Sequence, residues 1–252
     1  MAKQVTPYSN SQQGKKEQVA GMFDTIAGKY DFLNHFLSLN IDKRWRKKVI
    51  KMVSEYHPQR ILDVATGTGD LAIAAVVAKP QRIDGIDISE GMLEVGMQKI
   101  ASKKLEGLIF LQKGDAEAIP FADESFDAIT VAFGVRNFEN LEKGLKEMYR
   151  VLKPGGICVV LEFTMPRQFP FKQLYGFYFK NLLPLIGRMV SKDTSAYTYL
   201  PESVKAFPQY QQFLDELTKA GFTNNQQKVL TMGIAAIYEG KKAMEMKPDS
   251  KF

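Results

Sequence analysis

Cysteine and histidine are scarce in this sequence, with one and two residues among 252. A single thiol, Cys158, cannot form an internal disulfide, and so few thiols and imidazoles leave no ligand cluster for a structural zinc ion. We therefore expect neither a disulfide scaffold nor a metal site. Glycine and proline, 19 and 11 residues, are too sparse for a collagen-like or low-complexity chain.

Long apolar runs are also missing. The most apolar stretch, residues 182–190, is short and is interrupted by Pro184 and Arg188, whereas a membrane span needs about 18 apolar residues. The first residues contain no apolar signal segment, and the first arginine is Arg44, which argues against a secretory signal and an Arg-rich transit peptide. The sequence predicts a cytoplasmic protein.

The charge is only mildly unbalanced, with a formal net charge of +6. Such a surplus could favour an anionic membrane surface or nucleic acid, but a few extra lysines are also ordinary on the solvated surface of a chain this size. We expect no nucleic-acid partner.

From Arg60 onward, short β-branched or apolar runs alternate with longer helical patterns, which is typical of βαβ units and a parallel sheet. The expected strands are residues 60–64, 83–88, 108–112, 126–133 and 156–163, with two further strands near 222–230 and 233–240. The expected helices are residues 71–79, 91–103, 141–152 and 209–220. At roughly 150 residues per domain the chain has room for one or two domains, and this alternation favours a single α/β domain.

Two regions lie outside the alternation. Residues 15–57 are expected to form a helical N-terminal cap, and residues 164–206 an aromatic-rich insertion. The aromatic residues of the insertion are Phe169, Phe171, Tyr175, Phe177, Tyr178, Phe179, Tyr197 and Tyr199. They suit a cover over an apolar ligand or a patch that touches lipid, and equally an ordinary core of aromatic helices.

The segment from Asp63 to Asp70, DVATGTGD, joins a buried strand to a helix through two glycines. Gly67, Gly69 and Ala72 fit a dinucleotide-binding pattern, and Asp87 lies 20 residues after Gly67, where a ribose-binding acid is expected. A nicotinamide-dependent oxidoreductase is therefore one interpretation.

Three acidic residues favour S-adenosylmethionine instead. Asp63 at the end of the first strand suits the amino group of a methionine moiety, whereas it would repel a pyrophosphate. Asp87 can accept hydrogen bonds from two ribose hydroxyls, and Asp115 after the third strand can accept from an adenine amino group beside Ile119. Because the ends of parallel strands share one edge of the sheet, these carboxylates are expected along one cleft.

Short-chain dehydrogenases carry a Tyr-x-x-x-Lys pair, and two pairs here have that spacing. Tyr149 and Lys153 lead directly into the helix stop at Pro154, and Tyr238 and Lys242 follow the last strand. Neither pair is expected beside a nicotinamide, so the spacing does not favour the oxidoreductase.

Several segments together carry a resemblance to a known family. They are Tyr30-Asp31-Phe-Leu-Asn34 with Ser38-Leu39 and Trp45, Gly67-Thr68-Gly69-Asp70, Phe133-Gly-Val-Arg136-Asn137, Tyr149-Arg-Val-Leu-Lys-Pro-Gly-Gly156, Leu161-Glu162-Phe163, and Tyr199-Leu200-Pro-Glu-Ser203 with Phe207-Pro208. Over about residues 23–240 the chain resembles the ubiquinone/menaquinone C-methyltransferases. The Tyr-Asp-x-x-Asn and Phe-Gly-x-Arg-Asn segments are far more specific to this family than the glycine loop.

The resemblance implies the class I S-adenosylmethionine-dependent methyltransferase fold, which is Rossmann-like with a mainly parallel seven-stranded sheet and helices on both faces. It further implies that Thr68, Asp87, Asp115 and Ala116 contact the cofactor. Two positions depart from the family pattern. Asp42 stands where the family often has histidine, and Ala132 where many members have serine.

The reaction implied is methylation of a prenylated quinol in menaquinone biosynthesis, with demethylmenaquinol as the expected acceptor. Quinones are electron-poor, so the acceptor should be the reduced quinol, made nucleophilic by loss of a hydroxyl proton. Our hypothesis is that Arg136 and Asn137, with Tyr30, Asp31 and Asn34, orient and deprotonate it. Asp31, or a water that it holds, is the candidate base.

Other interpretations stay open. They are a benzoquinol acceptor in ubiquinone biosynthesis, another apolar acceptor such as a sterol or fatty acyl chain, a nicotinamide-dependent oxidoreductase, and a noncatalytic module that keeps the cofactor pocket. A prenylated substrate also suggests peripheral contact with the inner face of the cytoplasmic membrane. The sequence leaves open whether the chain forms a homodimer.

Overall fold

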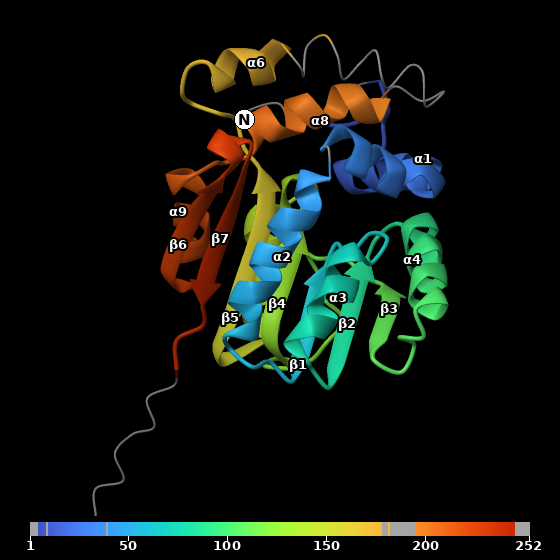
Figure 1. Ribbon diagram of the computed structural model, residues 1–252, viewed down its shortest axis with the longest axis vertical. Coiled ribbons are helices and arrows are strands. Elements are labelled where there is room, and N and C mark those ends of the chain that lie inside the picture. The colour runs from blue at the N-terminus through green and yellow to red at the C-terminus, as the bar shows by residue number, and fades with distance from the viewer. Residues whose placement is uncertain (1–4, 9, 39, 178–180, 182–194, 245–252) are drawn as a thin grey trace, which may run out of the picture.

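Seven strands form one sheet in the computed structural model, which describes residues 5–8, 10–38, 40–177, 181 and 195–244, without the side chains of residues 32–37 and 195–197. The strands are β1 (Arg60–Val64), β2 (Arg82–Asp87), β3 (Ile109–Lys113), β4 (Phe126–Ala132), β5 (Leu152–Phe163), β6 (Thr223–Leu230) and β7 (Ala235–Lys241). Their order across the sheet is β3-β2-β1-β4-β5-β7-β6. The first five strands are parallel, and β7 runs antiparallel to β5 and β6. The predicted seven-stranded, mainly parallel sheet is confirmed (Figure 1).

Strand β1 lies at the centre of the parallel part. Leu62 pairs with Asp84 of β2 on one side and with Ile129 of β4 on the other. Residues 61–64 are buried, because helices cover both faces of the sheet and a strand inside such a sheet has no solvated face.

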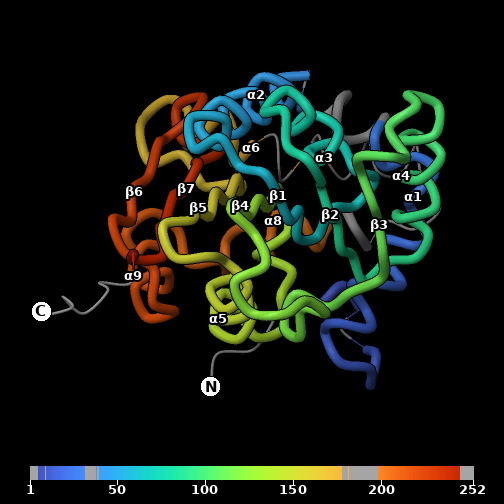
Figure 2. The backbone as a smooth tube through the Cα atoms, turned by 90° about the horizontal axis from the view of Figure 1, so that it is seen from below, coloured from blue at the N-terminus to red at the C-terminus, as the bar shows by residue number. Residues whose placement is uncertain are grey.

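The helices that pack on the sheet are α2 (Ile41–Ser54), α3 (Asp70–Ala75), α4 (Glu90–Ser102), α5 (Leu141–Val151) and α9 (Gln211–Lys219). Helices α5 and α9 bury residues such as Leu145 and Phe213 against one face. Helices α2, α3 and α4 contribute Val49, Ala72 and Ile100 to a second core on the other face. Figure 2 shows α2 and α3 on one side of the sheet and α5 and α9 on the other, so the predicted helices on both faces are confirmed.

Two elements differ by several residues from the expected boundaries, and the expected N-terminal cap is divided. The helix expected over residues 71–79 stops at Ala75 and continues as a 3-10 turn, Val76–Ala78. Strand β5 begins at Leu152 rather than residue 156, because Leu152 already pairs with Phe126. The cap expected over residues 15–57 is two helices, α1 (Lys15–Leu37) and α2, which are separated at Asn40, where φ is +59°.

Helix α1 and helix α8 (Ser195–Ala206) lie over the carboxyl ends of the parallel strands (Figure 1). Asp24 of α1 accepts hydrogen bonds from the Ser89 hydroxyl (2.6 Å) and from the Gly91 amide (3.0 Å). Ser89 also caps the start of α4, since its hydroxyl accepts from the Met92 amide. The cover is thereby attached to the α4 side of the sheet.

The aromatic insertion is divided between surface and core. Phe169 and Phe177 are exposed at 81% and 60%, and Phe171 is also exposed, whereas Tyr175 and Tyr199 are buried. Tyr178, Phe179 and the side chain of Tyr197 lie outside the described residues. Of the helices described here, none has the length and apolar character needed to cross a membrane.

Cys158 lies in the middle of β5 and is buried at 1% exposure. Burial raises the pKa of its thiol to about 12, because a thiolate in this apolar surrounding would lose its hydration. Among the described residues, no group of three or more histidine, cysteine or acidic side chains is placed to hold a metal ion.

Candidate active site

A cavity of about 640 Å³, counting the space open to solvent at its mouth, lies at the carboxyl edge of the sheet. Its walls include residues that follow β1, β2 and β4, among them Gly67, Ile88 and Phe133, and helix α1 contributes Phe23 and Tyr30. From β1 the chain continues to β2 and β3 on one side of the sheet, whereas β4 and β5 lie on the other side of β1. The strand order therefore reverses at β1. This is the place where open α/β sheets bind their ligands.

The glycine loop after β1 brings main-chain atoms to the cavity wall. Gly67 and Gly69 have φ angles of +56° and +77°, a conformation that glycine adopts without a steric penalty. A Cβ placed on Gly67 would meet no atom within 4 Å. The backbone at Gly67 therefore borders open space into which a ligand can come close.

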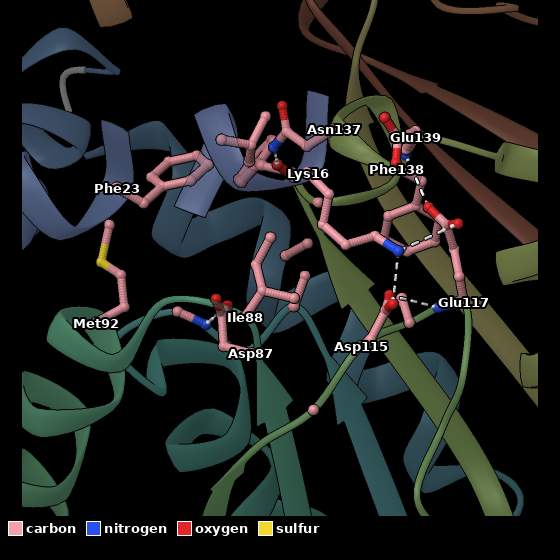
Figure 3. Close-up of a pocket in the computed structure, with 18 of the residues that line it drawn as sticks. Lys16, Phe23, Asp87, Ile88, Met92, Asp115, Glu117, Asn137, Phe138 and Glu139 are labelled. Atoms are coloured by element: carbon pink, nitrogen blue, oxygen red, sulfur yellow. Dashed lines mark hydrogen bonds and ion pairs between the residues drawn. The ribbon is translucent and has the colours of Figure 1, made fainter. Parts of the chain in front are cut away.

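Asp87 ends β2 and lines the cavity from below (Figure 3). Its two carboxylate oxygens accept hydrogen bonds from the Gly67 amide (2.8 Å) and from the Ser89 amide (2.9 Å). Burial raises the pKa of Asp87, and the amide bonds partly oppose this. Each oxygen keeps a second lone pair, so the carboxylate can still accept hydroxyl donors from a ligand.

Asp63, at the carboxyl end of β1, does not line the cavity. Its carboxylate is buried at 1% exposure and accepts hydrogen bonds from the hydroxyls of Thr66 and Thr130, both at 2.7 Å. Burial raises its pKa to about 6, although these hydroxyls and the Arg46 charge act in the opposite direction. In this structure Asp63 holds the glycine loop to β4.

Asp115 and Ala116 form part of the opposite wall, after β3. The Lys16 ammonium at the start of α1 lies between two acidic side chains, 2.6 Å from an Asp115 oxygen and 3.5 Å from a Glu117 oxygen (Figure 3). Sequence analysis did not single out Lys16 or Glu117. The only available signal was their charge, and a charge by itself does not indicate a partner about 100 residues away.

Lys15 provides a second connection between α1 and the cavity. Its buried ammonium donates to the carbonyl oxygens of Arg136 (3.0 Å) and Phe138 (2.8 Å). Desolvation, reinforced by the nearby Arg136 charge, lowers the pKa of Lys15 to about 8. The first turn of α1 is thus attached to both the loop after β3 and the loop after β4.

Thr68 and Asp31 meet beside the glycine loop rather than in the cavity. The Thr68 hydroxyl donates to one Asp31 oxygen at 2.5 Å, and the Lys99 ammonium binds the other at 2.7 Å. Lys99 also pairs with Asp70 at the start of α3. Asp31 therefore joins α1 to the loop and to α4.

Tyr30 and Asn137 line the cavity, whereas Arg136 lies behind its wall. Arg136 and Asn137 belong to the short 3-10 helix η2 (Val135–Asn137). The Arg136 guanidinium binds the Glu162 carboxylate at 2.9 Å and the carbonyl of Phe133, and its side chain is 7% exposed. Asn34 lies on α1, but its side chain is outside the described residues.

Phe133 has a strained backbone, with φ at +60°. Its ring stacks on Phe163 with centroids 4.3 Å apart, and Trp45 packs against both rings at 6.2 Å. Non-glycine residues keep this conformation only where the surroundings impose it, and such residues concentrate at functional sites. The stacked rings fix the position of the Phe133 carbonyl oxygen, which accepts a hydrogen bond from the Arg136 guanidinium.

The cavity fits S-adenosylmethionine. Asp87 offers acceptors for ribose hydroxyls, and the open space over Gly67 admits a ligand against the backbone. The Asn137 Oδ1 atom is buried with no hydrogen-bond partner in the described structure, so this wall also has an acceptor available for a donor on the ligand.

The two Tyr-x-x-x-Lys pairs lie elsewhere. Tyr149 packs edge-on against Phe222 at 5.2 Å, and the Lys153 ammonium binds Asp127 at 2.7 Å. Tyr238 is fully buried and its hydroxyl accepts from the Tyr210 amide. None of these residues lines the cavity, so the geometry gives no support to a dehydrogenase site.

Comparison with known proteins agrees with this geometry. The profile of the ubiE/COQ5 methyltransferase family matches residues 11–242. A demethylmenaquinone methyltransferase of Bacteroides fragilis is 51% identical over 240 residues, which cover 94% of this chain and 97% of the relative. A ubiquinone/menaquinone biosynthesis C-methyltransferase UbiE of Geotalea daltonii is 51% identical over 230 residues, with 90% and 97% covered.

Among solved structures, a SAM-dependent methyltransferase of Thermotoga maritima superimposes with a TM-score of 0.61 at 21% identity, covering 88% of this chain and 99% of that one. This likeness concerns the fold, and it confirms the class I methyltransferase architecture. The match over residues 11–242 confirms the predicted family resemblance and S-adenosylmethionine as the cofactor. The chain belongs to the ubiE/COQ5 methyltransferase family.

Proposed function

We propose that this protein transfers the methyl group of S-adenosylmethionine to a ring carbon of a prenylated quinol, converting demethylmenaquinol to menaquinol. The observation that carries the proposal is the 51% identity to the Bacteroides fragilis demethylmenaquinone methyltransferase, which extends over 94% of this chain. A benzoquinol is the second candidate acceptor, because the name of the Geotalea daltonii relative includes ubiquinone as well as menaquinone.

The cofactor is assigned to the cavity at the carboxyl edge of the sheet. Asp87 accepts the ribose hydroxyls, and Gly67 lets the backbone approach the ligand. Gly69 faces Leu111 and Ile100 and allows the turn of the loop. Asp115 and Ala116 border the adenine. The Asp115 carboxylate accepts a hydrogen bond from the adenine amino group, which replaces the Lys16 ammonium as its partner. Asp63 and Thr68 act from behind the loop, through their bonds to Thr66, Thr130 and Asp31.

The acceptor carbon must be electron-rich when it meets the methyl group. When bound, S-adenosylmethionine supplies an electrophilic methyl group and leaves as S-adenosylhomocysteine. A quinol hydroxyl that has lost its proton donates electron density to the neighbouring ring carbon, so this carbon forms the new bond. The ring carbon then releases its hydrogen as a proton and the ring becomes aromatic again. The oxygen anion that this leaves takes up a proton from water, which restores the diol.

Arg136, Asn137 and Tyr30 are assigned to the quinol. The Arg136 guanidinium favours the ionised hydroxyl through its charge, and Asn137 and Tyr30 orient the ring from the cavity wall. Asp31 is engaged by Lys99 and Thr68, so we assign it the positioning of α1 and the glycine loop. The hydroxyl proton is assigned to water, because both Asp31 oxygens already accept hydrogen bonds, from Thr68 and from Lys99.

The test follows radiolabelled methyl transfer from S-adenosylmethionine to demethylmenaquinone in detergent, with and without a reductant that forms the quinol. We expect labelled menaquinone only with the reductant. A benzoquinone with a free ring position is assayed in parallel to compare the two acceptors. Absence of label in both acceptors, with S-adenosylhomocysteine binding shown by calorimetry, would refute the quinol assignment and leave the fold and cofactor unaffected.

Peripheral contact with a membrane is part of the proposal, because the acceptor carries a prenyl chain. Phe169 is exposed at 81%, and Leu174 and Phe177 of helix α6 (Phe171–Phe177) at 60% each. The sequence from residue 163 to residue 192 contains five basic residues and no acidic residue. An apolar patch inside a positively charged segment suits the surface of an anionic bilayer.

We expect co-sedimentation with vesicles that contain anionic phospholipid, weakened by Phe169→Ser combined with Phe177→Ser. The matched control is Met97→Ser, which removes an exposed apolar side chain from α4. Equal sedimentation of both variants with the wild type would contradict the assignment. The oligomeric state, monomer or homodimer, is left open by the sequence, and sedimentation equilibrium determines it.

A further inference from the structure

The hydroxyl group of Tyr199 is buried without a hydrogen-bond partner in the part of the chain that the structure describes. Tyr199 lies on α8 and is 3% exposed. Nearly all buried hydroxyls in native proteins are paired, because an unpaired one loses its bonds to water and gains nothing in return. An unpaired hydroxyl in this position calls for an explanation.

Two further polar atoms without partners belong to the loop against which α8 packs. They are the Arg136 Nε atom and the Asn137 Oδ1 atom, both in η2. Among the described residues, η2 and α8 therefore contribute two unpaired donors, an Nε–H and an O–H group, together with one acceptor. A single ligand between these two neighbouring elements would give all three atoms a partner.

The charged groups around Tyr199 form an ion pair. Arg136 pairs with Glu162, whose side chain is 0% exposed, so the buried ion pair is neutral overall. Both residues act electrostatically on Tyr199, with burial as the main influence on its pKa, which rises to about 12. The hydroxyl therefore keeps its proton over the working pH range and serves as a donor.

Tyr199 also lies against the wall of the cavity. It shares an apolar cluster with Val19 and Met22, and Phe23 and Ile88 pack on this cluster. Val19, Phe23 and Ile88 line the cavity. Tyr199 is not itself among the lining residues, but it packs directly on side chains that are.

We propose that the Tyr199 hydroxyl and the Arg136 Nε–H group bind the ionised oxygen of the quinol, beside the ring carbon that receives the methyl group. This assignment rests on the proposed function, and it adds Tyr199 as a catalytic residue. Two fixed donors in a dry site stabilise an oxyanion without the cost of reorienting water. The quinol hydroxyl then ionises at a lower pH than in water, and the ring carbon becomes nucleophilic.

The test compares Tyr199→Phe with Tyr238→Phe, which each remove one buried hydroxyl. The Tyr238 hydroxyl accepts a hydrogen bond from the Tyr210 amide at 2.9 Å, so its loss strands a buried amide. We expect Tyr238→Phe to unfold at lower urea concentration with an unchanged kcat. We expect Tyr199→Phe to unfold at the same or a higher urea concentration, because it removes an unpaired polar atom.

In the methyl-transfer assay, Tyr199→Phe should lower kcat by about 100-fold, as loss of one oxyanion donor does. The pH range over which the kcat of this variant increases should lie higher than in the wild type, because the bound quinol ionises less readily. S-adenosylhomocysteine should bind with the wild-type affinity. Arg136→Lys keeps a positive charge beside Glu162 but lacks the Nε–H group. The increase of its kcat with pH should also be shifted to higher pH.

An unchanged kcat and pH profile in Tyr199→Phe, with an active wild type, overturns the assignment of Tyr199 alone. Loss of stability in Tyr199→Phe equal to that in Tyr238→Phe also overturns it, because the hydroxyl then has a structural partner. If Tyr199→Phe fails to fold, an unchanged pH profile in Arg136→Lys overturns it. A wild type that does not methylate demethylmenaquinol overturns the proposed function instead.

Discussion

Replacing Asp63 with asparagine should stabilise the ligand-free protein at neutral pH. Burial raises the pKa of Asp63 from 3.8 to about 6. A shift of about two pKa units corresponds to about 3 kcal/mol between the two protonation states. The charged carboxylate therefore costs about 3 kcal/mol at pH 7, and the amide of Asp63→Asn, which carries no charge, avoids this cost. The Thr66 and Thr130 hydroxyls can rotate to meet either end of the amide.

The pH dependence gives the sign of the effect. Well below its ordinary pKa of 3.8, Asp63 is protonated in both the folded and the unfolded chain, so it contributes no penalty. Between about pH 4 and pH 6 the carboxyl is ionised in the unfolded chain and still protonated in the folded one, so stability falls as the pH rises; above about pH 6 both are ionised and the loss is complete. The free energy of unfolding of Asp63→Asn minus that of the wild type should therefore grow between pH 4 and pH 7. Urea denaturation at half-unit intervals measures it.

Asp84→Asn is the matched control, since Asp84 is also a buried aspartate, in the neighbouring strand. Asp84 accepts from Arg60 at 3.0 Å and from Arg82 at 2.7 Å, so its replacement leaves two cations without their partner. Its free energy of unfolding at pH 7 should fall. A wild type and an Asp63→Asn variant with parallel pH profiles, or a less stable Asp63→Asn at pH 7, would refute the reasoning about Asp63.

Three further substitutions test the site and the core. Gly67→Ala places a Cβ in the open space at φ +56°, so it should weaken S-adenosylhomocysteine binding in calorimetry and lower stability by about 1 kcal/mol. Normal binding would show that the ligand does not approach this backbone. Lys15→Met removes the bonds to the carbonyls of Arg136 and Phe138 and should lower kcat more than cofactor affinity, which methyl-transfer kinetics and calorimetry separate. Phe213→Ala, in the core under α9, should cost about 3–5 kcal/mol in urea denaturation and leave the cofactor affinity of the folded protein unchanged.

The central sheet could be predicted because parallel strands buried on both faces have nearly continuous apolar sequences. Asp63, Asp87 and Asp115 were also expected at one edge, since each follows or ends a strand of the same sheet. The structure places Asp87 and Asp115 in the cavity wall and Asp63 behind it. The sequence could not show this difference, because it depends on where Thr66 and Thr130 direct their hydroxyls.

The ion pairs around the site could not be predicted. Lys16 reaches Asp115 from 99 residues away, and Arg136 reaches Glu162 from the end of another strand. In the sequence, a charged residue on a helix has many possible partners of opposite charge. Which of them Lys16 contacts is decided only by how α1 packs on the sheet. The choice of quinol came from the family resemblance, since composition and periodicity contain no information about the acceptor.

The burial of Cys158 has a consequence for chemical compatibility with the substrate. A quinone with an unsubstituted ring carbon is electron-poor and adds thiolates, so an accessible cysteine would be alkylated by the oxidised form of the proposed acceptor. The only thiol of the chain lies inside β5 with its pKa raised to about 12, where it is neither ionised nor accessible. Its alkylation therefore requires the central sheet to open, and the rate of that reaction reports how often β5 separates from its neighbours.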